Sequence, residues 1–240
     1  MRVKAFVIII MLLGSWVTRV SAQAPQPDSV AYSKTANEVI DYFNATAGSQ
    51  LEFFNGAQYV LNPPANIGSW YFQDKNYCAS SLIRFNNTWY KNVPVLYDVY
   101  NDKMISFSGD DYFVLNTEKI SDVYLLDHHF AYVNDPGLPR GFYDVLYNGK
   151  SQVLAKRTKF SNDDIVSSRS VKFIYEDRVA LFLKKGNVYY PVTGKRTLIN
   201  LFGDKKKEIK QYIKDHKIDY KKDKERTAAV LAGYYDQLTQ

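Results

Sequence analysis

One stretch of the chain, residues 69 to 192, constrains the fold more than any other. Apolar and polar residues alternate there in short segments, clearly so in residues 93–100, and turn signals separate the segments. One of these signals, Asn148-Gly149, is of the strongest short hairpin type. About ten such segments follow one another without a long helical period between them, which predicts an antiparallel sheet and argues against a doubly wound parallel one. The expected strands include 151–156, 171–175 and 179–183.

Helical periodicity appears on both sides of this stretch. Upstream, Thr35 and Glu38 have the spacing of a capping box, and the apolar residues that follow share one helical face until Gly48. Downstream of Gly194 the helical period returns, and its last segment carries an apolar stripe that ends at Leu238. We therefore expect a mainly β fold (α+β). It would be a curved antiparallel sheet or partly open barrel of about ten strands, with one N-terminal helix and two to three C-terminal helices.

These patterns divide the chain into four expected parts: a signal peptide (1–24), a linker and N-terminal helix (25–48), an antiparallel β domain (49–194), and a C-terminal helical segment packed on the sheet (195–240). The first part has a basic start, an uncharged and mostly apolar core over residues 5–14, and small residues that allow cleavage after Ala22 or Ala24. A retained anchor is the alternative, and Arg19 disfavours it. We expect export to the periplasm, with association with the outer membrane left open, and no transmembrane span in the mature chain.

Export would concentrate the positive charge in one segment. The full chain has a net charge of +6, and the signal peptide carries three of its basic residues. Residues 204–226 hold ten basic and six acidic residues, so the rest of the mature chain is nearly neutral. Alternating signs are typical of a solvated helix face, but a contact with a lipid or outer-membrane surface stays open, while export argues against nucleic acid. The candidates for this basic contact are Lys205, Lys206, Lys207 and Lys210.

Few residues suggest chemistry, and we expect no cofactor, metal ligand or catalytic residue. Asp127-His128-His129 contains two of the three histidines, but neighbouring residues on a strand point to opposite faces, which hinders joint chelation of one ion. Cys78 is the one cysteine. It excludes an internal disulfide, and we expect it to be buried or, less favoured, paired with another chain.

Four aspartates keep an enzymatic alternative open. A carboxylate pair suits glycoside hydrolysis, although turn formation explains three of the four residues. These aspartates are Asp98, Asp102, Asp110 and Asp111.

Aromatic residues are in excess, at 15% of the chain with 20 tyrosines. They help to locate the sheet, because aromatic side chains favour strands and fill sheet cores. Where aromatic residues are consecutive on a strand, their rings alternate between the faces, so some rings lie outside the core and can contact a partner or ligand. The candidates for such a surface are Trp70, Tyr71, Phe72, Trp89 and Tyr90.

Three motifs in order along the chain carry a resemblance. Residues 89–98 (WYKNVPVLYD), 141–150 (GFYDVLYNGK) and 234–238 (YYDQL) resemble an uncharacterised family of secreted proteins from Bacteroidota. The likeness covers nearly the whole mature chain. It implies a cell-envelope location and a β-rich body with C-terminal helices, and it favours the periplasm over the cell surface. It carries over no catalytic residue.

Three functions remain open on these grounds. The leading hypothesis is a non-enzymatic cell-envelope protein that binds a partner protein in outer-membrane or periplasmic assembly or maintenance. The first alternative is a periplasmic carrier of a lipid or other apolar ligand held in a curved sheet. The second alternative is a glycan hydrolase that uses an Asp pair.

Overall fold

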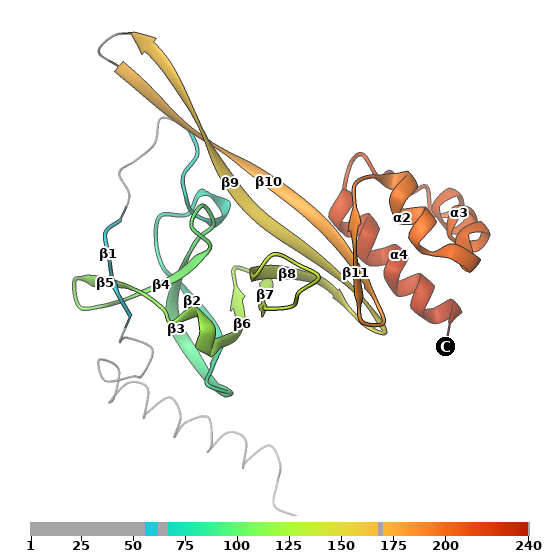
Figure 1. Ribbon diagram of the computed structural model, residues 1–240, viewed down its shortest axis with the longest axis horizontal. Helices are drawn as coiled ribbons and strands as arrows, with labels where there is room; N and C mark the ends of the chain where they lie inside the picture. Colours follow the sequence, from blue (N-terminus) through green and yellow to red (C-terminus); the bar gives the residue numbers. More distant parts are fainter. Residues whose placement is uncertain (1–55, 62–66, 168–169, 240) are drawn as a thin grey trace, which may run out of the picture. The chain divides into compact units, whose positions relative to one another are not determined.

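The computed structural model describes residues 56–61, 67–167 and 170–239 (Figure 1). Within residues 162–167 and 170–172 only the backbone is described. Contacts divide the chain into two compact units, residues 1–39 and 40–240, and every described residue belongs to the second unit. The expected signal peptide and the expected helix of residues 35–48 lie outside the described residues.

The described strands form one antiparallel sheet of eleven strands in the order β1-β5-β4-β3-β2-β6-β7-β8-β9-β10-β11. From β2 the chain runs outward through hairpins to β5, then returns so that β6 pairs with the other side of β2. From β6 a second run of hairpins continues to β11. The strands are β1 (Gln58–Tyr59), β2 (Ala79–Phe85), β3 (Thr88–Asp98), β4 (Lys103–Ser108), β5 (Asp111–Val114), β6 (Ile120–Leu125), β7 (His128–Val133), β8 (Gly141–Asn148), β9 (Ser151–Ser167), β10 (Ser170–Lys185) and β11 (Val188–Val192).

The prediction of a mainly β fold with C-terminal helices is confirmed, and the sheet is not closed, since β1 and β11 are its two ends. Some strand boundaries differ from expectation. β10 is one strand where 171–175 and 179–183 were expected as two, β9 continues well beyond residue 156, and β1 lies in a stretch expected to be irregular. β9 and β10 pair with each other along most of their length. Backbone hydrogen bonds therefore hold β9 and β10 together even where Glu176 and Asp177 interrupt the apolar alternation of β10.

Asparagine residues form the turn between β2 and β3. Asn86 and Asn87, between β2 and β3, have φ angles of 45° and 65°, a conformation that asparagine tolerates better than most residues. β8 ends at Asn148, and Gly149 and Lys150 join it to β9, so the hairpin lies where it was expected. Neither Asn148 nor Gly149 has a positive φ angle, however, so the turn is not of the type that Asn-Gly favours.

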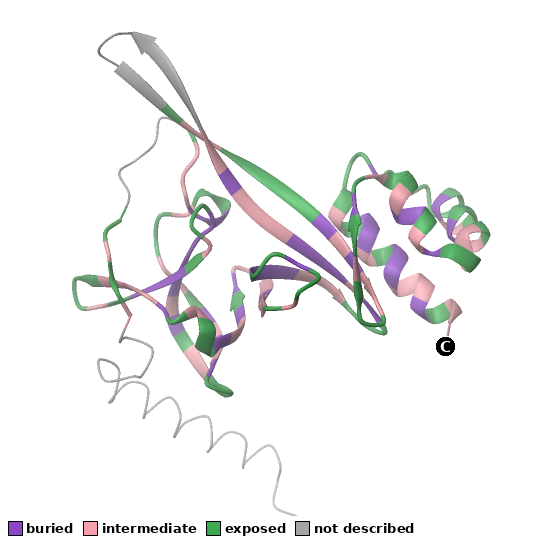
Figure 2. Ribbon diagram, in the orientation of Figure 1, coloured by how far each residue is buried: buried purple, intermediate pink, exposed green. Residues whose placement is uncertain are grey.

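One side of β2, β3, β6 and β7 carries the main core, and we call it the inner face. Ile83, Phe85, Val123 and Phe130 alternate onto this face and have no exposed area. The ring of Tyr97 packs edge-on against Phe130 at 5.0 Å between centroids. The burial pattern along these strands is visible in Figure 2. We call the opposite side of the same strands the outer face.

Three α-helices follow the sheet, and the apolar stripe expected at the end of the chain is buried. Ala228, Leu231 and Ala232 of α4 have no exposed area and share a second core cluster with side chains of β9 and β10. Asp236 of α4 also accepts a hydrogen bond from the backbone N–H of Ser151 at 2.8 Å. The helices are α2 (Lys195–Leu201), α3 (Lys206–Asp215) and α4 (Lys224–Leu238), and short 3-10 turns lie at η3 (Phe72–Asp74), η4 (Thr117–Lys119) and η5 (Gly203–Lys205).

Candidate functional site

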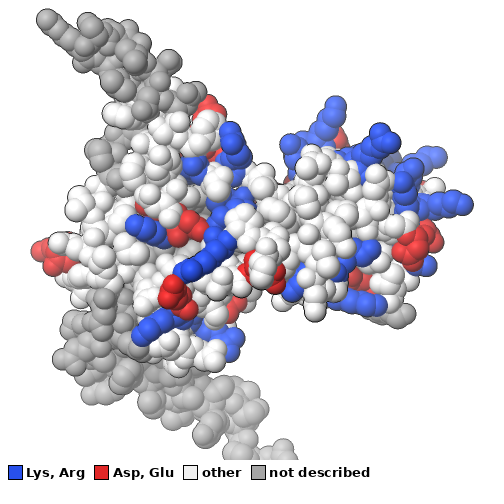
Figure 3. All heavy atoms as spheres, in the orientation of Figure 1, with Lys and Arg blue, Asp and Glu red and all other residues white. Residues whose placement is uncertain are grey.

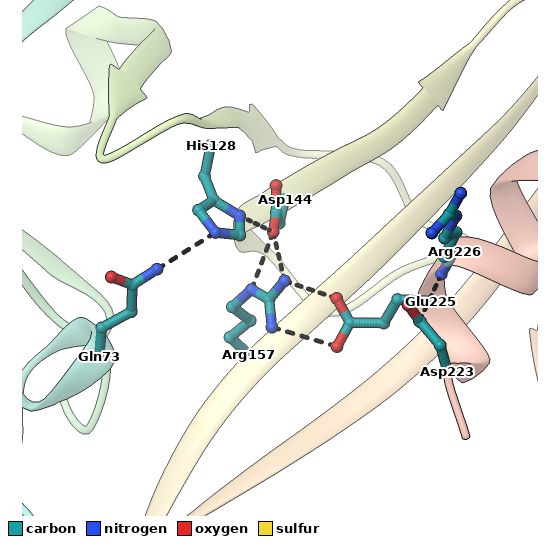
Figure 4. A network of polar contacts seen from close by, with 7 residues as sticks. All are labelled: Gln73, His128, Asp144, Arg157, Asp223, Glu225 and Arg226. Carbon is teal, nitrogen blue, oxygen red and sulfur yellow. Dashed lines mark hydrogen bonds and ion pairs between the residues drawn. The ribbon is translucent and has the colours of Figure 1, made fainter. Parts of the chain in front are cut away.

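A chain of polar side chains links the inner face to α4 (Figure 4). His128 Nδ1 lies 2.7 Å from Asp144 Oδ2, and Arg157 Nε donates to the same oxygen at 2.9 Å. Arg157 also donates from Nη2 to Glu225 Oε2 at 2.7 Å. On the other side of the imidazole, His128 Nε2 lies 3.3 Å from the amide nitrogen of Gln73. The network therefore ties η3, β7, β8, β9 and α4 together.

The electrostatics of this network favour a structural role. The Asp144 side chain is 2% exposed and shares one oxygen with His128 and Arg157. Burial opposes the charge of Arg157, but the hydrogen bonds and charges of Glu225 and Asp144 outweigh it and raise the pKa of the guanidinium group. The histidine of a His–Asp pair can act as a general base. Here, however, the group beside His128 Nε2 is the Gln73 amide, which is not a nucleophile.

Asp98 and Asp102, two of the candidate hydrolase carboxylates, are bound into the fold. Asp98 has no exposed area and accepts a hydrogen bond from Tyr59 Oη at 2.8 Å. Asp102 accepts hydrogen bonds from Tyr97 Oη and from Lys156 Nζ, both at 2.6 Å. Burial and the Asp102 charge hold the pKa of Tyr97 well above its usual range, so its hydroxyl remains a donor. These contacts are those expected of structural carboxylates.

Asp110 and Asp111, the other two candidates, lie exposed at the turn between β4 and β5. Asp111 Oδ1 accepts a hydrogen bond from Gln58 Nε2 at 3.3 Å. This contact joins the edge strand β1 to β5, so Asp111 also has a structural partner.

The outer face carries an exposed cluster that we call the aromatic platform, defined as Leu82, Arg84, Trp89, Asp122, Tyr124 and His129. Strand register builds it in two rows, because Arg84 lies opposite both Trp89 and Asp122, while Tyr124 lies opposite both Leu82 and His129. The rings of Tyr124 and His129 are stacked at 4.3 Å, and those of Trp89 and Tyr124 are 6.0 Å apart. Trp89 and Tyr124 are nonetheless 39% and 44% exposed.

One of the hydrogen-bond donors of Arg84 has no acceptor among the described residues. Its guanidinium group lies 5.7 Å from the Trp89 ring centre and 4.0 Å from Asp122 Oδ2. Its Nε–H is buried without an acceptor among the described residues. The platform thus presents two partly exposed rings beside a partly exposed cation.

A groove of about 790 Å³ continues from the platform past the β6–β7 turn. Leu82, Tyr124 and His129 belong to both features, and Asp144 brings the groove to the edge of the buried network. Its full lining is Ser80, Leu82, Tyr124, Leu126, Asp127, His128, His129, Asp144, Val145 and Leu146. The outer face therefore offers flat aromatic surface and an adjoining depression.

The structure separates the five aromatic residues predicted as a contact surface. Trp89 is exposed in the platform, and Tyr90, directly after it, is half-buried against the inner-face core. Tyr71 and Phe72 are buried, and Trp70 is half-buried beside the Tyr71 cluster. The buried rings of Tyr71 and Phe72 are a correction to the expected surface, since the chain after β1 carries them into the core instead of along an outer strand.

Sequence reasoning missed Arg84, Tyr124 and His129 as members of this surface. The alternation of residues 122–126 indicated a strand, but not which strand would lie beside it. The pairing of β2 with β6 brings Arg84 beside Tyr124, and the hairpins β2–β3 and β6–β7 add Trp89 and His129. Only the exposed face of each strand could have been read from the alternation.

The two histidines of the Asp127-His128-His129 segment have different partners. His128 lies against Asp144 on the inner face, whereas His129 Nε2 lies 2.8 Å from Asp122 on the outer face. This matches the expectation that adjacent strand residues point to opposite faces. Across the described residues, no group of three or more His, Cys, Asp or Glu side chains is arranged to hold a metal ion.

Cys78 is half-buried and has no disulfide partner in the described part of the chain. Burial raises the pKa of its thiol to about 11. The thiol is therefore protonated at neutral pH.

The four lysines predicted as a basic contact lie in η5 and the first turns of α3. Lys206 and Lys210, one helical turn apart on α3, line a groove together with residues of α2. Lys207 lines a different groove with Glu208 and Asp215. Lys205 is half-buried in the η5 turn.

No protein family, curated protein or solved structure matches this chain. Among the described helices, none is both long enough and apolar enough to cross a membrane.

Proposed function

We propose that this chain is a non-enzymatic binding protein of the cell envelope that holds a partner protein on its aromatic platform. The observation that carries the proposal is the exposure of Trp89 and Tyr124 around Arg84 on a sheet face whose other side is core. Trp, Tyr and Arg are the residue types that dominate binding energy at protein interfaces. The adjoining groove would receive a protruding side chain of the partner.

The cellular setting of the proposal comes from the sequence. The expected signal peptide places the partner in the periplasm or at the outer membrane, as does the resemblance to secreted proteins from Bacteroidota. We propose further that the sheet is curved and that helices from both ends of the chain pack on it.

The two alternatives have less support from the structure. A carrier of an apolar ligand needs an apolar cavity, yet Tyr97, Phe130 and Phe142 fill the inner face with rings in edge-to-face contact. A glycan hydrolase needs two free carboxyl groups at a set separation, yet Asp98 and Asp102 are engaged in structural hydrogen bonds.

The direct test is affinity capture from envelope extracts with the mature chain and two variants. Trp89→Ala combined with Tyr124→Ala removes both exposed rings of the platform. Tyr190→Ala removes an equally accessible ring from β11, which is 37% exposed and outside the platform. We expect a stoichiometric partner that the double variant loses and Tyr190→Ala retains.

The proposal fails if no stoichiometric partner is recovered under conditions in which the chain is folded. It also fails if the double variant and Tyr190→Ala retain the partner equally. Circular dichroism and urea denaturation of each variant would separate lost binding from lost folding.

A further inference from the structure

A groove formed by α2 and α3 is lined by four basic residues and by no acidic residue. Its lining is Lys195, Arg196, Ile199, Asn200, Lys206 and Lys210, and its volume is about 490 Å³. Lys and Arg side chains gather over the helical segment in Figure 3. We call this feature the basic groove.

The cations of the basic groove have no carboxylate partner. None of Lys195, Arg196, Lys206 and Lys210 forms an ion pair within the described part of the chain. Like charges brought together in this way repel one another. The neighbouring groove at Lys207 differs, since Glu208 and Asp215 also line it. Acidic residues are thus available on α3, but they line the other groove.

The donor set of the basic groove suits a multiply charged oxyanion. Arg196 offers a planar fork of parallel N–H donors, while the lysines offer compact charges that can approach from several sides. The side-chain amide of Asn200 adds a neutral donor, and buried Ile199 supplies an apolar floor. A single carboxylate would use only part of this set, whereas a phosphate group presents several acceptor oxygens and up to two charges.

We infer that the basic groove binds the phosphate group of a phosphorylated ligand. This inference is independent of the aromatic platform, because the two features share no residue and lie on different elements. The phosphate could come from a soluble monoester or from the monoester headgroup of an anionic lipid such as phosphatidic acid, and the contacts named here are the same for both sources.

Two probes distinguish the sources. Binding of inorganic pyrophosphate is measured by titration calorimetry on the mature chain. Binding to a membrane is measured by flotation with vesicles of equal parts phosphatidic acid and phosphatidylcholine, and with vesicles of phosphatidylcholine alone. Saturable binding of pyrophosphate indicates a soluble ligand, while binding only to the anionic vesicles indicates a headgroup. Either result supports a phosphate site.

A matched pair of charge reversals locates the site. Lys206→Glu combined with Lys210→Glu places two acids in the basic groove and should weaken binding by about tenfold or more. Lys221→Glu combined with Lys222→Glu makes the same change in net charge at exposed positions outside the groove. At physiological salt the control should change binding by about twofold or less, because Lys221 and Lys222 do not line the groove and salt screens exposed charges that are not in contact with the ligand.

A conservative variant tests the geometry of recognition. Arg196→Lys keeps the charge but removes the fork, so it should bind less tightly than the natural chain and more tightly than the groove reversal. The inference is overturned if neither probe binds. It is also overturned if both charge-reversal pairs weaken binding equally, since bulk charge then accounts for the effect. Thermal unfolding of all variants shows whether each is folded.

Discussion

The basic residues of β9 and those of α2 and α3 differ in how the fold uses them. Lys156, Arg157 and Lys159 lie close together on β9, and each has a carboxylate within ion-pair distance. Lys159 is the extreme case, with no exposed side-chain area and an Asp74 oxygen 2.6 Å from its ammonium group. The cations of the basic groove have no such partner.

The different exposure of these cations to water explains why only those of β9 are paired. A charge removed from water must be paired, or its burial costs more than the fold can offset. Asp74 is the carboxylate that pairs with the buried Lys159. Burial tends to raise the pKa of the Asp74 carboxyl group, but the hydrogen bond and charge of Lys159 prevail and lower it. On the helices water solvates the cations, so the fold does not require them to be paired. Unpaired cations that converge there are available for a ligand.

The largest expected effect on stability comes from breaking the buried network. Asp144→Ala would leave Glu225 as the carboxylate partner of Arg157 and would remove the carboxylate partner of His128. We expect a loss of about 3 kcal/mol in the free energy of unfolding, measured by urea denaturation. Glu118→Ala is the control, because its pair with Arg140 is largely exposed and should contribute no more than about 1 kcal/mol. Equal losses would contradict the structural role of the network.

A smaller loss is expected from Tyr97→Phe. This change removes only the hydroxyl that donates to Asp102 on the core side of the sheet, while Lys156 remains bound to that carboxylate. We expect the free energy of unfolding to fall by about 1–2 kcal/mol. Tyr190→Phe, at an exposed ring, should change it by less than about 0.5 kcal/mol. A Tyr97 variant as stable as the natural chain would show that the hydroxyl is dispensable.

Alkaline pH should weaken the sheet without any mutation. Burial raises the pKa of Cys78 to about 11, and burial together with the Asp102 charge raises the pKa of Tyr143 to about 12. Folding therefore favours the protonated groups. Their contribution is complete below the pKa values of the unfolded chain and is lost as pH rises through the folded values. The urea midpoint should fall between about pH 9 and 12, and a constant midpoint over that range would refute the assignment.

The smallest effect on stability is expected in the basic groove. Lys206→Glu combined with Lys210→Glu removes no ion pair and should change the free energy of unfolding by less than about 0.5 kcal/mol. The same variant is expected to lose phosphate binding. A large destabilisation would show that these lysines serve the fold, and the contrast with β9 would disappear.

The candidate sites were only partly predictable from the sequence. Trp89 was identified because consecutive aromatic residues on a strand must place one ring outside the core. Arg84 and Tyr124 were not, since their place beside Trp89 depends on the pairing of β2 with β6. In the same way, Lys206 and Lys210 were candidates from charge alone, whereas Lys195 and Arg196 join them through the packing of α2 near α3.

The sequence by itself determined the features that depend on neighbouring residues. The position of the hairpin after Asn148 and the buried stripe of α4 follow from the local sequence and the helical period, both of which act within a few residues. Tertiary structure alone decided which strands meet after the chain returns from β5 to β6, and it brought Arg157 to Glu225 across 68 positions of sequence. The alternation of apolar and polar residues predicts the two faces of a strand, but it does not predict which other strand will pair with it. Partner choice comes from the burial and charge pairing of the whole fold.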